Sequence, residues 1–112
     1  MIEITNIDDN YNQQFQYVVE GYDTAYFNIY FKPRQLSWFM DLTFGNVEIF
    51  GERIAVSPNL LRQFKNRLPF GIAIYGPDLV DPFAVDAFLK GWKFYILSKT
   101  EINEIEDDFY GR

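Results

Sequence analysis

The chain has 112 residues, of which 48% are hydrophobic and 20% aromatic, and its formal net charge is −6. This length suits one domain with a single core, and the hydrophobic content excludes general disorder. The chain contains no cysteine and no histidine, which excludes disulfides and thiolate metal sites and removes the usual general base.

A β-hairpin is the first predicted element. Residues 13–20 alternate polar and apolar side chains, and residues 25–32 form a second strand rich in tyrosine, phenylalanine and isoleucine after a turn at residues 21–23. Pro33 ends the second strand because proline cannot donate a hydrogen bond to a ladder. The next strand follows almost immediately, which predicts a meander.

The strongest period-two alternation lies in residues 35–54. Apolar side chains share one parity, and mostly small or polar side chains share the other, as is typical of a half-buried strand. A turn at Gly45 and Asn46 divides two arms, so a second hairpin is predicted. The apolar positions of the first arm are Leu36, Trp38, Met40, Leu42 and Phe44.

One short helix is predicted near residues 58–67. Ser57 is a favourable N-cap, and Pro58 fits the first helical position. Beyond it, residues 72–75 favour a brief strand, and Asp81 with Pro82 favours a second helical turn through Ala87. Residues 92–100 favour a final strand with apolar side chains on both faces, so we expect both faces to be covered.

These elements predict a mainly β fold, either a small antiparallel β-sheet or a barrel-like domain, with one short helix near residues 58–67. We expect one domain over residues 1–112, with a core at about residues 13–100 and an acidic C-terminal segment at residues 101–112. No apolar run approaches the roughly 20 residues that span a bilayer. We therefore expect no membrane insertion and a soluble protein that is intracellular or assembled inside a cell.

Charge is uneven along the chain. Residues 1–31 carry five acids and no lysine or arginine, residues 32–99 carry nine basic and six acidic groups, and residues 100–112 carry five acids and one arginine. The acidic ends are either solvated tails or segments that add onto a neighbouring subunit of complementary charge. The net negative charge argues against nucleic acid as the main ligand.

Candidates for reactive or metal-binding residues are few. Asp41 lies on the polar parity of its strand without a placed catalytic partner, so we expect it to pair with Arg53 or Arg34, or to accept a hydrogen bond from a loop amide. No phosphate-binding glycine motif is present. We expect no catalysis, no cofactor and no metal site. Three further acids suit turns and caps better than a calcium loop: Asp78, Asp81 and Asp86.

The order and spacing of several short motifs resemble a known family, the baseplate plug proteins of contractile-tailed phages, named from a cyanophage baseplate. The resemblance covers roughly residues 13–99 and leaves out residues 1–12 and the end after Thr100. Its motifs also include Gln13 with Phe15, Arg53 with Ile54, and the predicted helix. The candidate structural residues that carry it are Trp38, Asp41, Gly51, Pro69, Gly71, Asp81, Pro82 and Gly91.

The resemblance implies a structural, non-enzymatic part of the virion tail, assembled in the host cytoplasm. Such a subunit would pack against hub, spike or tube proteins and help to close the tail tube. The aromatic content exceeds what so small a core can enclose, so some rings should face partners. Two alternatives stay open. One is a small acidic inhibitor or immunity-type protein; the other is an OB-like nucleic-acid-binding module whose stacking residues would be Tyr17, Tyr26 and Tyr30.

Overall fold

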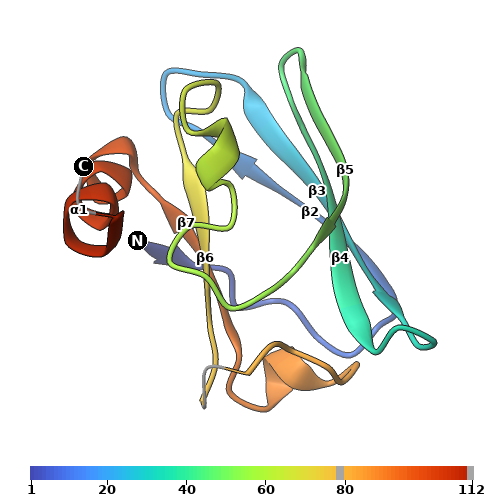
Figure 1. Ribbon diagram of the computed structural model, residues 1–112. Helices are drawn as coiled ribbons and strands as arrows, with labels where there is room; N and C mark the ends of the chain where they lie inside the picture. Colours follow the sequence, from blue (N-terminus) through green and yellow to red (C-terminus); the bar gives the residue numbers. More distant parts are fainter. Residues whose placement is uncertain (78–79, 111–112) are drawn as a thin grey trace.

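The computed structural model describes residues 1–77 and 80–110. Two antiparallel sheets face each other, and one helix lies on the outer side of the smaller sheet (Figure 1). The larger sheet has the order β2-β3-β4-β5, with strands Asn12–Val18, Thr24–Lys32, Ser37–Phe44 and Val47–Arg53. The smaller sheet has the order β1-β7-β6, with strands Ile2–Glu3, Lys93–Leu97 and Gly71–Tyr75.

Both predicted hairpins are confirmed, and together they form the four-stranded meander. The alternation along β4 sets its orientation, because every second side chain from Trp38 to Phe44 is buried between the sheets. Leu36 is the exception to the predicted parity. It precedes the strand, has a φ of 50°, and is 58% exposed. Its amide donates to the carbonyl of Pro33, so Leu36 belongs to the β3–β4 turn.

The core lies between the two sheets and is rich in aromatic rings. Phe27 of β3 stacks on Phe15 of β2 with ring centroids 4.8 Å apart, and it meets Phe94 of β7 edge-to-face at 6.2 Å. These contacts join the sheets directly. The described strands form two open sheets and no closed barrel, so the open-sheet alternative is correct and the barrel-like one is wrong.

The helix predicted at residues 58–67 is the main error of local structure. The structure has only a three-residue 3₁₀ helix there, η1 (Arg62–Phe64). Ser57 does not cap it, because Ser57 forms an isolated bridge with Ile74. The amide of Leu60 also donates to the carbonyl of Ile72 over 2.6 Å. The segment therefore pairs with the free edge of β6, which competes with helix formation.

The remaining predicted elements are present with small shifts in their bounds. The expected strand at residues 72–75 is β6, and the final strand is the shorter β7. A second 3₁₀ helix, η2 (Ala87–Leu89), begins where the predicted helical turn was expected to end. Asp78 lies outside the described residues.

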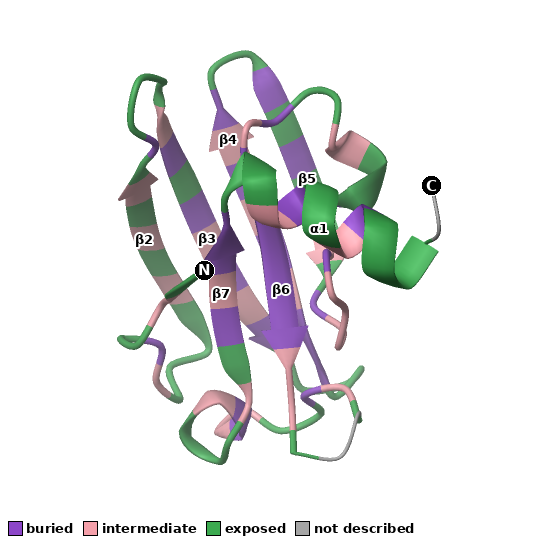
Figure 2. Cartoon of the chain, turned by 90° about the vertical axis from the view of Figure 1, so that its left-hand side faces the viewer, coloured by how far each residue is buried: buried purple, intermediate pink, exposed green. Residues whose placement is uncertain are grey.

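The acidic C-terminal segment is a packed helix and not a solvated tail. Helix α1 (Lys99–Tyr110) lies over the outer face of the smaller sheet (Figure 2). Its buried residues are Ile102 and Glu106. Ile102 packs with Ala73 and Leu97 in a second apolar cluster. This cluster covers the outer face of β7 at Leu97 and partly at Tyr95, whereas Lys93 is exposed. The expectation that both faces of the last strand are covered is therefore met only in part.

Candidate functional site

Trp38 anchors the larger sheet to the long loop between β6 and β7. Its side chain is completely buried, and its Nε1 donates to the carbonyl of Ala84 over 3.0 Å. Its ring meets Phe31 and Phe88 edge-to-face, with centroids 5.6 and 5.7 Å away. The indole is therefore both a core residue and a tie to the loop.

Asp81, at the same end of the molecule, also connects the long loop to the larger sheet and the segment that follows it. Its Oδ1 accepts a hydrogen bond from the amide of Val56 over 2.9 Å, and its Oδ2 lies 3.4 Å from Arg53 Nη2. The adjacent Pro82 is buried. These contacts fix where the loop leaves the smaller sheet and crosses the end of β5.

Asp41 accepts hydrogen bonds from two groups on the outer face of the larger sheet. Its Oδ1 receives the Tyr30 hydroxyl at 3.0 Å and the Gly51 amide at 2.8 Å. The expected pairing with Arg53 or Arg34 is wrong, since Arg53 turns toward Asp81. Asp41 is an acceptor as expected, but the amide that donates to it lies in strand β5 and not in a loop. Burial of the phenol and its bond to Asp41 both raise the pKa of Tyr30.

Gly71 allows a close approach by a buried polar side chain. A Cβ at this position would lie 2.7 Å from Asn59 Oδ1. That oxygen accepts hydrogen bonds from the amides of Leu61 and Ile72. Pro69 lies two residues earlier and is half-buried, whereas Gly91 has a φ of +109° next to Pro77.

The eight residues of the resemblance therefore occupy separate places. Trp38, Asp81 and Pro82 hold the long loop, and Asp41 and Gly51 lie at a bulge. Gly71 begins β6 against Asn59, Pro69 precedes that strand, and Gly91 lies beside Pro77. No chemical centre joins these eight residues, and the described residues contain no group of three or more acids that could hold a metal ion.

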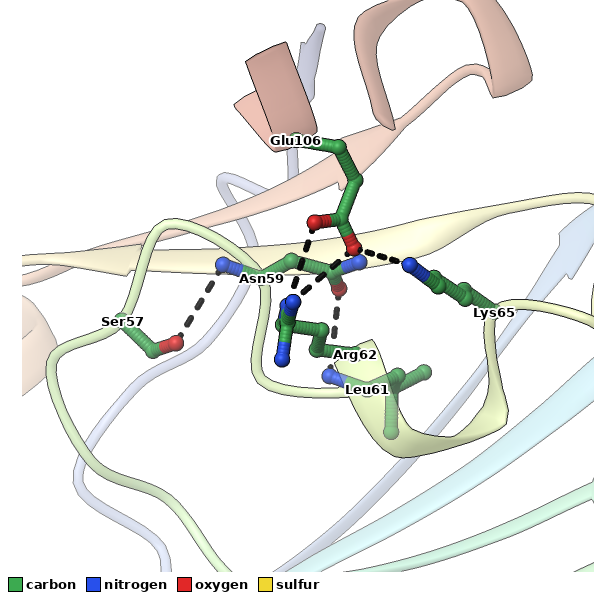
Figure 3. Close-up of polar contacts among 6 residues, drawn as sticks. All are labelled: Ser57, Asn59, Leu61, Arg62, Lys65 and Glu106. Carbon is green, nitrogen blue, oxygen red and sulfur yellow. Dashed lines mark hydrogen bonds and ion pairs between the residues drawn. The ribbon is translucent and has the colours of Figure 1, made fainter. Parts of the chain in front are cut away.

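Sequence reasoning missed an ionic cluster between α1 and η1. Glu106 is buried, and its Oε1 lies 2.7 Å from Lys65 Nζ and 3.1 Å from Arg62 Nε (Figure 3). The hydrogen bond from Lys65, and then that from Arg62, lower the pKa of Glu106 although burial opposes them. The guanidinium of Arg62 also lies 3.8 Å from the centre of the Tyr110 ring. The available signal was the spacing of four residues between Ile102 and Glu106, which places both on one helical face.

An open groove crosses the outer face of the larger sheet. It has a volume of about 440 Å³ and lies over β2, β3 and β4. The amide oxygen of Asn28 is buried there without a hydrogen-bond partner among the described residues. Besides Phe15 and Phe27, the groove is lined by polar residues: Gln14, Gln16, Tyr26, Asn28, Asp41 and Thr43.

Several exposed apolar side chains belong to segments that lie at one end of the molecule, where the long loop is found (Figure 1). We call this set the loop-end patch; its members come from the start of β2, the β3–β4 turn and the long loop. Two exposed cations lie close by in the chain, Lys32 at the end of β3 and Arg34 in the β3–β4 turn. The residues of the loop-end patch are Tyr11, Leu36, Val80, Phe83 and Leu89.

Comparison with known proteins supplies the family. No curated protein matches this chain. The model of the family described as cyanophage baseplate Pam3 plug gp18 matches residues 1–101, so the match includes the N-terminal residues that the resemblance left out and ends near the start of α1. No described helix is long and apolar enough to cross a membrane. The chain belongs to this family of phage baseplate plug proteins, which are structural components of the virion tail.

Proposed function

We propose that this protein packs at the hub of a contractile-tail baseplate and helps to close the tail tube. It does so as a structural subunit without catalytic activity, and it joins hub, spike or tube proteins during assembly in the host cytoplasm. The family supports the baseplate setting. The loop-end patch is the observation that carries the proposed contact.

The chemistry of the loop-end patch suits a protein interface. Leu36 is 58% exposed, Phe83 45% and Leu89 57%, so each of these side chains has apolar area to bury on association. Arg53 lies 5.8 Å from the Phe83 ring, and mixtures of aromatic rings and arginine are enriched in interfaces. Trp38 fixes the loop from behind, so the patch is preorganised.

Charge indicates the character of the partner. Lys32 and Arg34 are exposed and form no ion pair within the described part of the chain. A partner surface with apolar side chains bordered by carboxylates would complement this end. The same complementarity would orient the otherwise acidic subunit as it docks.

The test is incorporation of variants into tails. A triple variant, Leu36→Ser, Phe83→Ser and Leu89→Ser, should be incorporated at least about tenfold less, because losing even one well-buried anchor costs an interface more than 1.4 kcal/mol. The matched control replaces three apolar residues elsewhere that are at least as exposed: Tyr22→Ser, Phe50→Ser and Phe109→Ser.

Quantitative mass spectrometry of purified tails measures incorporation, and the melting temperature of each free variant shows whether it folds. We expect both triple variants to fold and only the loop-end variant to be missing from tails. Normal incorporation of a folded loop-end variant would contradict the proposed contact.

A further inference from the structure

We propose that the groove on the outer face of the larger sheet binds a neutral oligosaccharide. Tyr26 is the stacking platform, and the groove amides with Asp41 contact the sugar hydroxyls. This inference is independent of the proposed packing at the hub, since the loop-end patch and the groove lie on different parts of the fold.

The groove offers both kinds of contact that a pyranose ring needs. Tyr26 is 56% exposed and pairs with no other ring among the described residues, so its face is free to pack against the C–H groups of a sugar. Beside it, Gln14, Gln16 and Thr43 carry both donors and acceptors. A sugar hydroxyl is itself donor and acceptor, so it matches these side chains.

Two acceptors are left for the ligand. Asn28 Oδ1 is buried and has no hydrogen-bond partner in the described structure. The hydrogen bonds that Asp41 accepts from Tyr30 and Gly51 both end on Oδ1, which leaves Oδ2 for a further donor. The same two bonds hold the carboxylate in place before a ligand arrives, so it can accept a hydrogen bond from a sugar hydroxyl without reorganisation.

The groove does not suit the other common ligand classes. It contains no lysine or arginine, and Asp41 would repel phosphate, which disfavours nucleic acid. It lies across β2, β3 and β4 in the middle of the ladder, where the backbone groups of β3 are already paired, so a peptide cannot add there as a strand. One carboxylate is too few for a divalent cation.

The test is a titration of the ¹⁵N-labelled protein, followed by NMR, with four neutral hexasaccharides: maltohexaose, cellohexaose, β-mannohexaose and N-acetylchitohexaose. At least one should give saturable shifts at the amides of Gln16, Asn28 and Asp41. Tyr26→Ala should weaken that binding at least about tenfold, since 1.4 kcal/mol is within the range of a stacked aromatic contact. The matched control is Tyr22→Ala, because Tyr22 is also an exposed tyrosine and does not line the groove.

A second variant separates binding from folding. Asn28→Ala should also weaken the interaction while the spectrum of the free protein stays folded, because the substituted amide has no partner to lose. Absence of saturable shifts with all four sugars would overturn the inference. Equal weakening by Tyr26→Ala and Tyr22→Ala would overturn it too, since the groove would then have no special part in binding.

Discussion

The amide of Gly51 donates a hydrogen bond to Asp41 Oδ1 over 2.8 Å, at the place where β4 and β5 shift register. The shift lies between Met40 and Leu42, and Gly51 there has a φ of +69°. A bulge leaves a backbone group without its ladder partner, and the carboxylate supplies that partner. Asp41 and Gly51, two residues of the family resemblance, thus stabilise the bulge together.

Removing the Asp41 carboxylate should destabilise the bulge. We expect Asp41→Ala to lower the free energy of unfolding by about 1–3 kcal/mol, because the Gly51 amide and the Tyr30 hydroxyl lose their partner. Asp41→Asn keeps an oxygen acceptor and should cost less. Urea unfolding measures both. Equal losses for the two variants would mean that charge, and not the hydrogen bond, matters at this position.

Trp38 should be among the most costly residues to truncate. Trp38→Ala should lower the free energy of unfolding by about 3–5 kcal/mol, as for other buried tryptophans, and it also removes the bond to the long loop. Phe50→Ala is the control, because Phe50 is 68% exposed and should change stability by less than about 0.5 kcal/mol. A loss below about 1 kcal/mol for Trp38→Ala would contradict its place in the core.

Gly71 should tolerate a side chain only when Asn59 is shortened. Gly71→Ala places a methyl group against Asn59 Oδ1 and should cost about 1–3 kcal/mol through overpacking. In an Asn59→Ala background the methyl group no longer meets that oxygen, so the same substitution should cost less. A double-mutant cycle by chemical denaturation measures this coupling. Additive losses would show that the contact with Asn59 is not the obstacle.

The ionic cluster of Glu106 should make stability depend on acidity. Its pKa is lower in the folded protein than in the unfolded chain, where glutamate titrates near about 4.3. The carboxylate therefore stabilises the fold fully above that pH, and the contribution is lost as the pH falls through the lower, folded-state pKa. We expect Glu106→Gln to lose less stability than the unmodified protein between pH 7 and pH 3.

The matched control for that comparison is Glu104→Gln, because Glu104 lies on the same helix and is exposed. Melting temperatures recorded across the same pH range should give the control variant the pH dependence of the unmodified protein. If Glu106→Gln follows the unmodified protein as well, the cluster with Lys65 and Arg62 does not contribute to acid sensitivity.

The two hairpins could be predicted because the alternation of each strand and the residues of each turn lie within a short stretch of sequence. The alternation from Trp38 to Phe44 reports burial on one face, and Gly45 and Asn46 report the turn. The sequence also offered an acceptor role for Asp41 as one of two alternatives, although toward a loop amide and not toward a strand. It could not name Gly51 as the donor, since that pairing depends on a register shift between two strands.

The errors arise where a contact between distant segments overrides a local signal. Ser57 has the chemistry of an N-cap but pairs with Ile74. The segment predicted to be helical is therefore held at the edge of β6 instead. Glu106 looks like one more acid in a charged tail, and only the fold brings Arg62 and Lys65 to it. Neither partner is recognisable from sequence spacing.

The most direct test of the baseplate role is a cryo-electron microscopy reconstruction of purified tails that carry this protein. We expect density that fits the two-sheet domain at the hub, on or around the tube axis, with Leu36 and Phe83 facing a neighbouring subunit. Tails without the protein should show an open tube end. A reconstruction of complete tails with no density for the domain, or with the domain placed away from the hub, would contradict the account.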